Sequence, residues 1–94
     1  MIEFCTMLII AKGKVYTSDI LKELQKANLL VVEGTLYPLL SRLKTEDLVE
    51  YDWEESRSGP PRKYYTLTRK GITSLARSKE AWQELSHSIN YLIQ

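Results

Sequence analysis

The stretch from Gly34 to Gly71 constrains this 94-residue chain more than any other segment. Its apolar residues recur first at helical spacing and then alternate as in a strand. The alternation resumes after the turn-forming run Ser58–Pro61. Thr68 then offers a favourable N-cap for a further helix. The segment therefore predicts a helix, a two-stranded hairpin with a tight tip, and the beginning of another helix.

Charged residues are sorted along the same part of the chain. Between Thr45 and Glu55 there are six acidic residues and no basic one, whereas between Ser56 and Lys79 there are seven basic residues and no acidic one. The net charge of +1 hides this asymmetry. A base-rich hairpin next to an amphipathic helix is typical of winged helix-turn-helix proteins, so binding to duplex DNA is the first functional hypothesis.

Composition limits the other classes of function. With 44% apolar and 27% charged residues, the chain is typical of one globular domain. Its apolar run Met7–Ala11 is far too short to span a membrane, so no membrane partner is expected. A single cysteine cannot form an internal disulfide, and a cytoplasmic location is the default expectation. One histidine and one cysteine cannot form a metal cluster, and no phosphate-binding glycine loop or nucleophile constellation is present. We therefore expect no enzyme, no cofactor and no metal.

The N-terminal part predicts two helices. Ile2–Ala11 is apolar almost all round, which favours a buried helix ended by Gly13. Thr17 or Ser18 is expected to cap a second helix that ends at about Asn28. The apolar connector that follows, residues 29–32, could pair as a small strand.

A third helix is expected to begin near Thr35, with Pro38 tolerated in its first turn. Four leucines at helical spacing (Leu36, Leu39, Leu40, Leu43) should face the core. The polar face could simply be solvated, but the neighbouring hairpin favours a role in DNA recognition. The candidates are Thr35, Tyr37, Pro38 and Ser41 for base edges, and Arg42 and Lys44 for phosphates.

The predicted hairpin pairs residues 48–53 with residues 63–67. Its tip could be an ordinary solvated turn, where acids would be as acceptable as bases. Because Arg57, Arg62 and Lys63 have no acidic neighbour near the tip, we prefer phosphate neutralisation, with Tyr64 as a further hydrogen-bond donor. The acidic residues of the first strand should then face away from DNA.

The last predicted helix runs from Thr68 to the end of the chain and would be about 39 Å long. The preceding domain is wide enough to cover only its first half. An apolar stripe of Trp82, Leu85, Ile89 and Leu92 would then lie in water. We expect a second copy of the chain to cover this stripe across a two-fold axis, with Phe4 at the same interface.

These elements predict a mainly α fold with a small β-wing, namely a winged helix-turn-helix. It would have a three-helix core, a two-stranded hairpin and a long C-terminal helix. Residues 1–67 would form the DNA-binding domain and residues 68–94 the dimerisation helix, together making one compact unit.

The chain resembles the PadR family of transcriptional regulators. The resemblance rests on the runs Glu33–Leu40, Arg42-Leu43, Trp53–Ser56, Ser58–Tyr65 and Leu67–Gly71. It implies a dimeric repressor whose third helix enters the major groove and whose wing touches the adjacent backbone or minor groove. It also implies that a small planar aromatic effector could bind near Trp82, with Phe4 and Met7 as neighbours, although a tryptophan on such an apolar stripe is more often interface filler.

We therefore expect a homodimeric repressor that occupies a pseudo-palindromic operator in double-stranded DNA and is released by a ligand or partner. A different class of function remains open. The same surfaces could belong to a winged-helix module that binds protein and not DNA, which the near-neutral net charge would suit.

Overall fold

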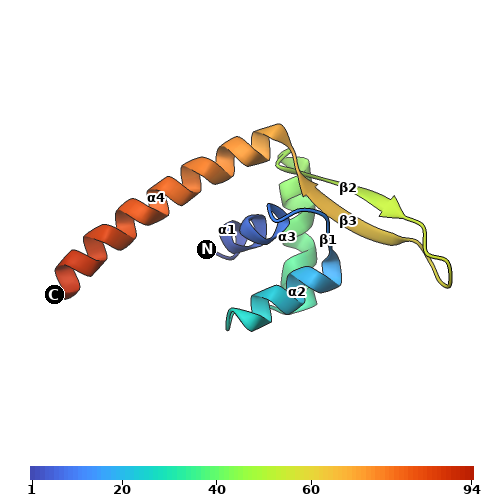
Figure 1. Ribbon diagram of the computed structural model, residues 1–94, viewed down its shortest axis with the longest axis horizontal. Helices are drawn as coiled ribbons and strands as arrows, with labels where there is room; N and C mark the ends of the chain where they lie inside the picture. Colours follow the sequence, from blue (N-terminus) through green and yellow to red (C-terminus); the bar gives the residue numbers. More distant parts are fainter.

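A computed structural model describes all 94 residues (Figure 1). Seven elements follow one another: α1 (Ile2–Ile10), β1 (Val15–Tyr16), α2 (Thr17–Lys26), α3 (Glu33–Thr45), β2 (Val49–Glu54), β3 (Arg62–Leu67) and α4 (Arg69–Ile93). The first three helices form a central body, from which the β2–β3 hairpin projects on one side and α4 on the other (Figure 1). The molecule is elongated as a result, measuring 55 × 28 × 20 Å. The predicted winged-helix fold is confirmed.

The sheet has three antiparallel strands in the order β1-β3-β2, one strand more than predicted. The wing pairs Val49 with Leu67 at its base and Glu54 with Arg62 near its tip. The third strand is Val15–Tyr16, which lies beside β3, whereas residues 29–32 form no strand. The proposed small strand in that connector was therefore wrong. A strand of two residues is too short to leave an alternating pattern in the sequence.

Two helix starts differ from expectation. Tyr16, not Thr17 or Ser18, is the N-cap of α2, and its backbone N–H donates to the Asp19 carboxylate at 3.2 Å. Helix α3 begins at Glu33, so Pro38 lies in the second turn and not in the first. Proline has no N–H to donate to the carbonyl four residues earlier. The carbonyl left without this hydrogen bond is that of Gly34. Gly34 and Pro38 are both exposed, so water can reach this carbonyl.

Two helices, α2 and α3, are each followed by a residue in the left-handed conformation, which turns the chain. Asn28 and Asp47 have positive φ angles of 63° and 61°, and each follows the last turn of a helix. After α3, the Leu48 N–H donates to the Leu43 carbonyl at 2.9 Å, and both leucine side chains are buried. This is a Schellman-type ending, and it fixes the direction in which β2 leaves the recognition-helix candidate.

The core consists of thirteen buried apolar residues drawn from every helix, from the sheet and from the connectors that hold Val31 and Leu48. Its α3 members are Leu36, Leu40 and Leu43, which confirms the predicted inward face; Leu39 is only partly buried. Helix α4 contributes much less. Only Gly71 and Leu75 of its 25 residues are buried.

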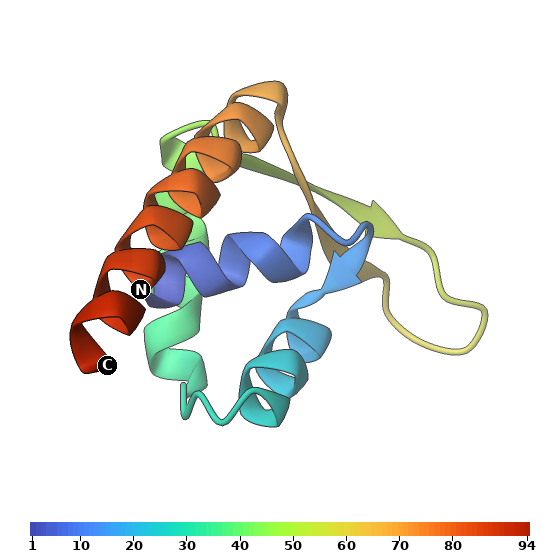
Figure 2. The same ribbon diagram turned by 60° about the vertical axis from the view of Figure 1, so that its left-hand side comes forward.

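The second half of α4 leaves the body, as expected. Figure 2 shows it passing the N-terminus of α1 and continuing beyond it. Trp82, Leu85, Ile89 and Leu92 are 44%, 53%, 43% and 77% exposed. The helix nevertheless lacks the length of unbroken apolar sequence that a membrane span needs, and so do the other three.

Candidate nucleic-acid interface

Helix α3 presents half of its circumference to solvent. Since Leu36, Leu40 and Leu43 hold the opposite side in the core, all six predicted contact residues of this helix are exposed. They form two edges. One edge carries Tyr37, Ser41 and Lys44, and the other carries Thr35, Pro38 and Arg42.

The second edge borders α1. Thr35, Pro38 and Arg42 line a hollow of about 370 Å³ together with Met1, Ile2, Glu3 and Leu39. Across it, the Arg42 guanidinium lies 2.6 Å from the Glu3 carboxylate, and both groups are partly exposed. Arg42 was predicted to meet phosphates. In this structure it is already paired, so a phosphate would have to displace Glu3.

The predicted wing residues lie on two different faces of the hairpin. Lys63 is on the face that continues into the core, where its ammonium lies 3.9 Å from the centre of the Tyr51 ring. Arg62 and Tyr64 are on the opposite face, because side chains alternate along a strand. Arg57, in the tip between the strands, is exposed and makes no ion pair or ring contact.

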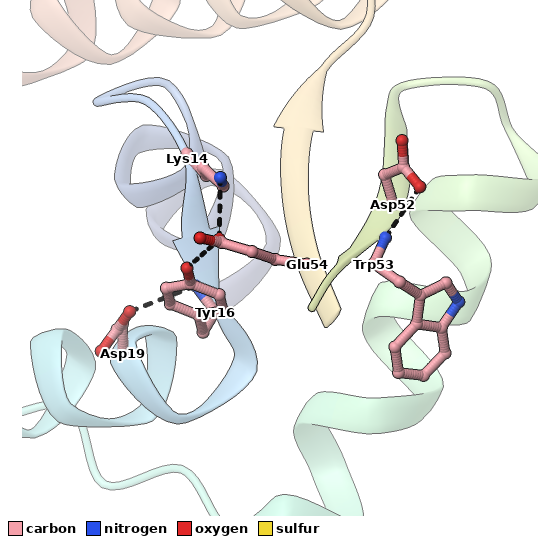
Figure 3. Close-up of polar contacts among 6 residues, drawn as sticks. All are labelled: Lys14, Tyr16, Asp19, Asp52, Trp53 and Glu54. Atoms are coloured by element: carbon pink, nitrogen blue, oxygen red, sulfur yellow. Dashed lines mark hydrogen bonds and ion pairs between the residues drawn. The ribbon is translucent and has the colours of Figure 1, made fainter. Parts of the chain in front are cut away.

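A polar network joins the opposite face of the wing to β1. Lys14 Nζ lies 2.7 Å from Glu54 Oε2, and the Tyr16 hydroxyl donates to the same oxygen. The Arg62 guanidinium lies 3.7 Å from the centre of the Tyr16 ring, and Tyr64 meets that ring edge-on. Figure 3 shows Glu54 reaching toward Lys14 and Tyr16, while Trp53 points to the other side of β2. Arg62 therefore has an acidic neighbour, contrary to its predicted isolation.

The network also shifts the protonation of its members. The Lys14 ammonium, ahead of the Tyr16 hydroxyl, lowers the pKa of the Glu54 carboxyl below its ordinary value. The Glu54 carboxylate in turn raises the pKa of Lys14 and the pKa of Tyr16, chiefly through its hydrogen bonds. All three groups therefore keep their neutral-pH forms, which tie the end of β2 to Lys14 and Tyr16 at the start of α2.

The predicted effector residues lie around the crossing of α1 and α4. Phe4 and Trp82 line one open hollow of about 290 Å³ with Met1, Ser78, Ala81 and Leu85. Met7 lines a neighbouring hollow of about 230 Å³, to which Phe4 also contributes. The structure thus brings Trp82 and Phe4 together and leaves Met7 one hollow away. No group of three or more His, Cys, Asp or Glu side chains lies close enough to hold a metal ion.

Sequence reasoning missed the partners that come from distant segments. Glu3 is 39 residues from Arg42, and Tyr16 is 38 residues from Glu54. Neither pair leaves a local signal. Tyr51 and Trp53 were expected on one face of their strand. The alternation did not predict that the hairpin projects past the core and leaves both side chains exposed.

A three-helix body, an antiparallel hairpin and a long terminal helix define a winged-helix protein. A family model described as the transcriptional regulator PadR-like family matches residues 7–77. The chain therefore belongs to the PadR-like family of transcriptional regulators.

Solved structures agree with that assignment. A PadR-like transcription factor from Bacteroides fragilis is 52% identical, with a TM-score of 0.85, and the match covers 98% of this chain and 89% of that one. A PadR-like transcriptional regulator from Bacillus cereus is 39% identical, with a TM-score of 0.90 and coverage of 98% and 90%. A PadR family transcription regulator from Clostridium difficile is 28% identical, with a TM-score of 0.90 and coverage of 99% and 98%. An uncharacterised protein from Lysinibacillus sphaericus is 28% identical over 64 residues, which make up 68% of this chain and 59% of that protein.

Proposed function

We propose that this chain is a homodimeric, sequence-specific DNA-binding regulator that acts in the cytoplasm as a ligand-responsive transcriptional repressor. One observation supports the proposal above all others. The exposed half of α3 lies next to a hairpin that carries unpaired positive charge, in a chain that belongs to a family of transcriptional regulators.

The two parts of this surface would have different roles. The N-terminal residues of a recognition helix reach deepest into the major groove, so Thr35, Tyr37, Pro38 and Ser41 are the proposed base contacts. Phosphate contacts fix register without reading sequence, and Lys44, Arg57 and Lys63 suit them best because no carboxylate occupies them. Arg42 would join them only after release from Glu3. Arg62 and Tyr64 would approach DNA from the outer face of the wing.

Dimerisation through α4 would supply the second half-site. The stripe of Trp82, Leu85, Ile89 and Leu92 repeats at steps of three and four residues, the spacing at which one face of a helix meets another helix. Burial of four large exposed side chains per protomer gives the driving force. Two recognition helices about 34 Å apart would then reach successive major grooves of a pseudo-palindromic operator.

An effector would act through the same region. A planar aromatic compound would fit the hollow beside Phe4 and Trp82, where both rings are accessible. Because α1 also carries Glu3, a ligand that moves α1 would alter the environment of the recognition helix.

Sequence selection from random duplexes, followed by fluorescence anisotropy, tests the proposal. Arg57→Ala should weaken binding to every duplex and make its salt dependence shallower. Tyr37→Ala should instead reduce the ratio between selected and random DNA, since it removes a proposed base contact. Equal losses on both DNAs for Tyr37→Ala would contradict its assignment.

A protein-binding winged-helix module is the second candidate. It is favoured by the exposed apolar stripe of α4 and by the net charge of only +1. A module of this kind would show no steep dependence on salt in duplex titrations.

A further inference from the structure

The first turn of α3 carries a carboxylate that has no partner within the chain. Glu33 is the first residue of this helix and is exposed. None of the four ion pairs in the structure includes it. Leu30 and Val32, in the connector just before it, are 93% and 69% exposed and have no side-chain donor to offer. The Glu33 carboxylate is therefore free to accept a hydrogen bond from another molecule.

An acid is unfavourable on a surface that faces DNA. Glu33 is the only acidic residue of α3, whose other charged residues are the basic Arg42 and Lys44. A carboxylate in the first turn stabilises a helix through the helix dipole, but the phosphates of DNA repel it. That repulsion is offset only where the carboxylate accepts a hydrogen bond from the DNA itself.

Duplex DNA offers such donors on its bases. In the major groove the donors are the N4 amino group of cytosine and the N6 amino group of adenine. The adenine amino group lies between two acceptors, adenine N7 and thymine O4, and both would repel a carboxylate. The cytosine amino group has an acceptor on one side only, which is guanine O6. Glu33 is therefore suited to cytosine more than to any other base.

Gly34, the next residue, has no folding reason to be glycine. It is exposed, its φ angle is not positive, and an added Cβ would meet no atom of the chain within 4 Å. Glycine within a helix costs stability relative to alanine, but it lets the backbone approach a ligand closely. Gly34 precedes Tyr37 and Pro38 by three and four residues, so it shares the exposed face of α3 with these proposed base contacts. The missing side chain allows the first turn of α3 to come close to the base edges.

We propose that Glu33 is a specificity-determining residue, which accepts a hydrogen bond from the N4 amino group of one cytosine in the major groove of each half-site. This inference rests on the proposed function. Gly34 is the point at which the α3 backbone lies against the base pairs, and it brings the Glu33 side chain within reach. At the other three bases the carboxylate meets an acceptor, N7 or O4, and the repulsion disfavours incorrect sequences.

Sequence selection from random duplexes, carried out with wild type and with Glu33→Gln, tests the assignment. The two selected motifs should differ at one position of each half-site. Wild type should select cytosine there and Glu33→Gln should select adenine, because a glutamine amide pairs with adenine N6 and N7. Replacing that cytosine by adenine in one half-site should weaken wild-type binding by about tenfold or more, as expected for a mismatched base pair. Random duplexes should bind Glu33→Gln more tightly than wild type, since a charge that repels phosphates is gone.

Glu84→Gln is the matched control. Glu84 is also an exposed acid without an ion pair, but it lies in the second half of α4. Its replacement should leave the selected motif unchanged and should alter binding to selected and random duplexes by the same factor.

Gly34→Ala tests the close approach independently of folding. This variant should melt at or above the wild-type temperature, because alanine favours the helix and its Cβ meets no other atom. It should nevertheless bind the selected duplex at least as weakly as Glu33→Gln does, and it should lose the preference for cytosine.

The outcomes separate this inference from the proposed function. If the wild-type protein binds no duplex in dilute buffer, the proposed function itself fails. If the wild type binds, but Glu33→Gln selects the same motif, the inference fails alone. It also fails if Glu33→Gln changes binding to selected and random duplexes by the same factor, since Glu33 would then be an ordinary solvated acid. Wild-type affinity of Gly34→Ala for the selected duplex would overturn the close approach at Gly34.

Discussion

The chain passes close to its own backbone where α4 leaves the sheet, and this gives a sharp prediction for Gly71→Ala. A Cβ atom at Gly71 would be 2.0 Å from the Leu48 carbonyl oxygen and 3.0 Å from its carbon. Ordinary contact begins at 3.4 Å, so the first turn of α4 would have to retreat by about 1.4 Å from the start of β2. The obstacle is backbone, which cannot rotate away as a flexible side chain can.

The cost follows from what that movement breaks. The Thr68 N–H donates to Leu48 O at 3.1 Å and the Thr68 hydroxyl donates to Asp47 O at 2.6 Å. Loss of these bonds costs about 1 kcal/mol each, and overpacking adds about 1–3 kcal/mol. The better helix propensity of alanine offsets about 1 kcal/mol. We expect a net destabilisation of about 2–4 kcal/mol, which lowers Tm by about 10–30 °C in a domain of this size.

Thermal melts followed by circular dichroism, at one fixed protein concentration, measure this effect. Gly34→Ala is the matched control, since Gly34 also lies in a helix but a Cβ there meets no atom within 4 Å. That variant should be slightly more stable than wild type, by about 0.5 kcal/mol. If Gly71→Ala melts within a degree or two of wild type, α4 does not rest on the Leu48 backbone and the argument is wrong.

Two further predictions concern the proposed complex, and a third concerns the stability of the fold. Glu3→Gln should release Arg42 and tighten DNA binding about two- to fivefold, the range of an exposed ion pair, whereas weaker binding would show that the pair supports the bound form. Leu85→Glu should convert the dimer to monomers in sedimentation experiments, while Gln83→Glu, which adds the same charge on the other side of α4, should leave it dimeric. The lowered pKa of Glu54 means that its contacts stabilise the fold at pH values above its unfolded pKa, and that this contribution is lost as the pH falls through the folded pKa. Glu54→Gln should therefore flatten the acid side of the stability–pH profile, and an unchanged profile would show that the network contributes nothing.

Much of this architecture could be predicted from sequence because it is encoded locally. The leucines of α3 mark its buried face by spacing alone. The Ser58–Pro61 turn and the flanking alternation mark the wing, and Thr68 marks the start of α4, where its hydroxyl accepts the Gly71 N–H at 2.9 Å.

What could not be predicted depends on contacts between distant segments or on weak signals. Strand β1 has two residues and exists only because β3 offers it an edge. Helix α3 starts at Glu33, two residues before Thr35. Its N-cap is Val32, which makes no side-chain hydrogen bond, so the sequence contains no capping residue that would mark this start. The pairing of Arg42 with Glu3 depends on how α1 packs beside α3, which no local pattern records.

In the proposed complex, two copies of this chain bind duplex DNA through phosphate contacts. The most direct test is a titration of a labelled duplex across a range of salt concentrations, with sedimentation of the complex in parallel. Lys44, Arg57 and Lys63 from each of two protomers predict a log–log slope of about −5 and a stoichiometry of two chains per duplex. A single chain per duplex, or a slope near zero, would contradict the account.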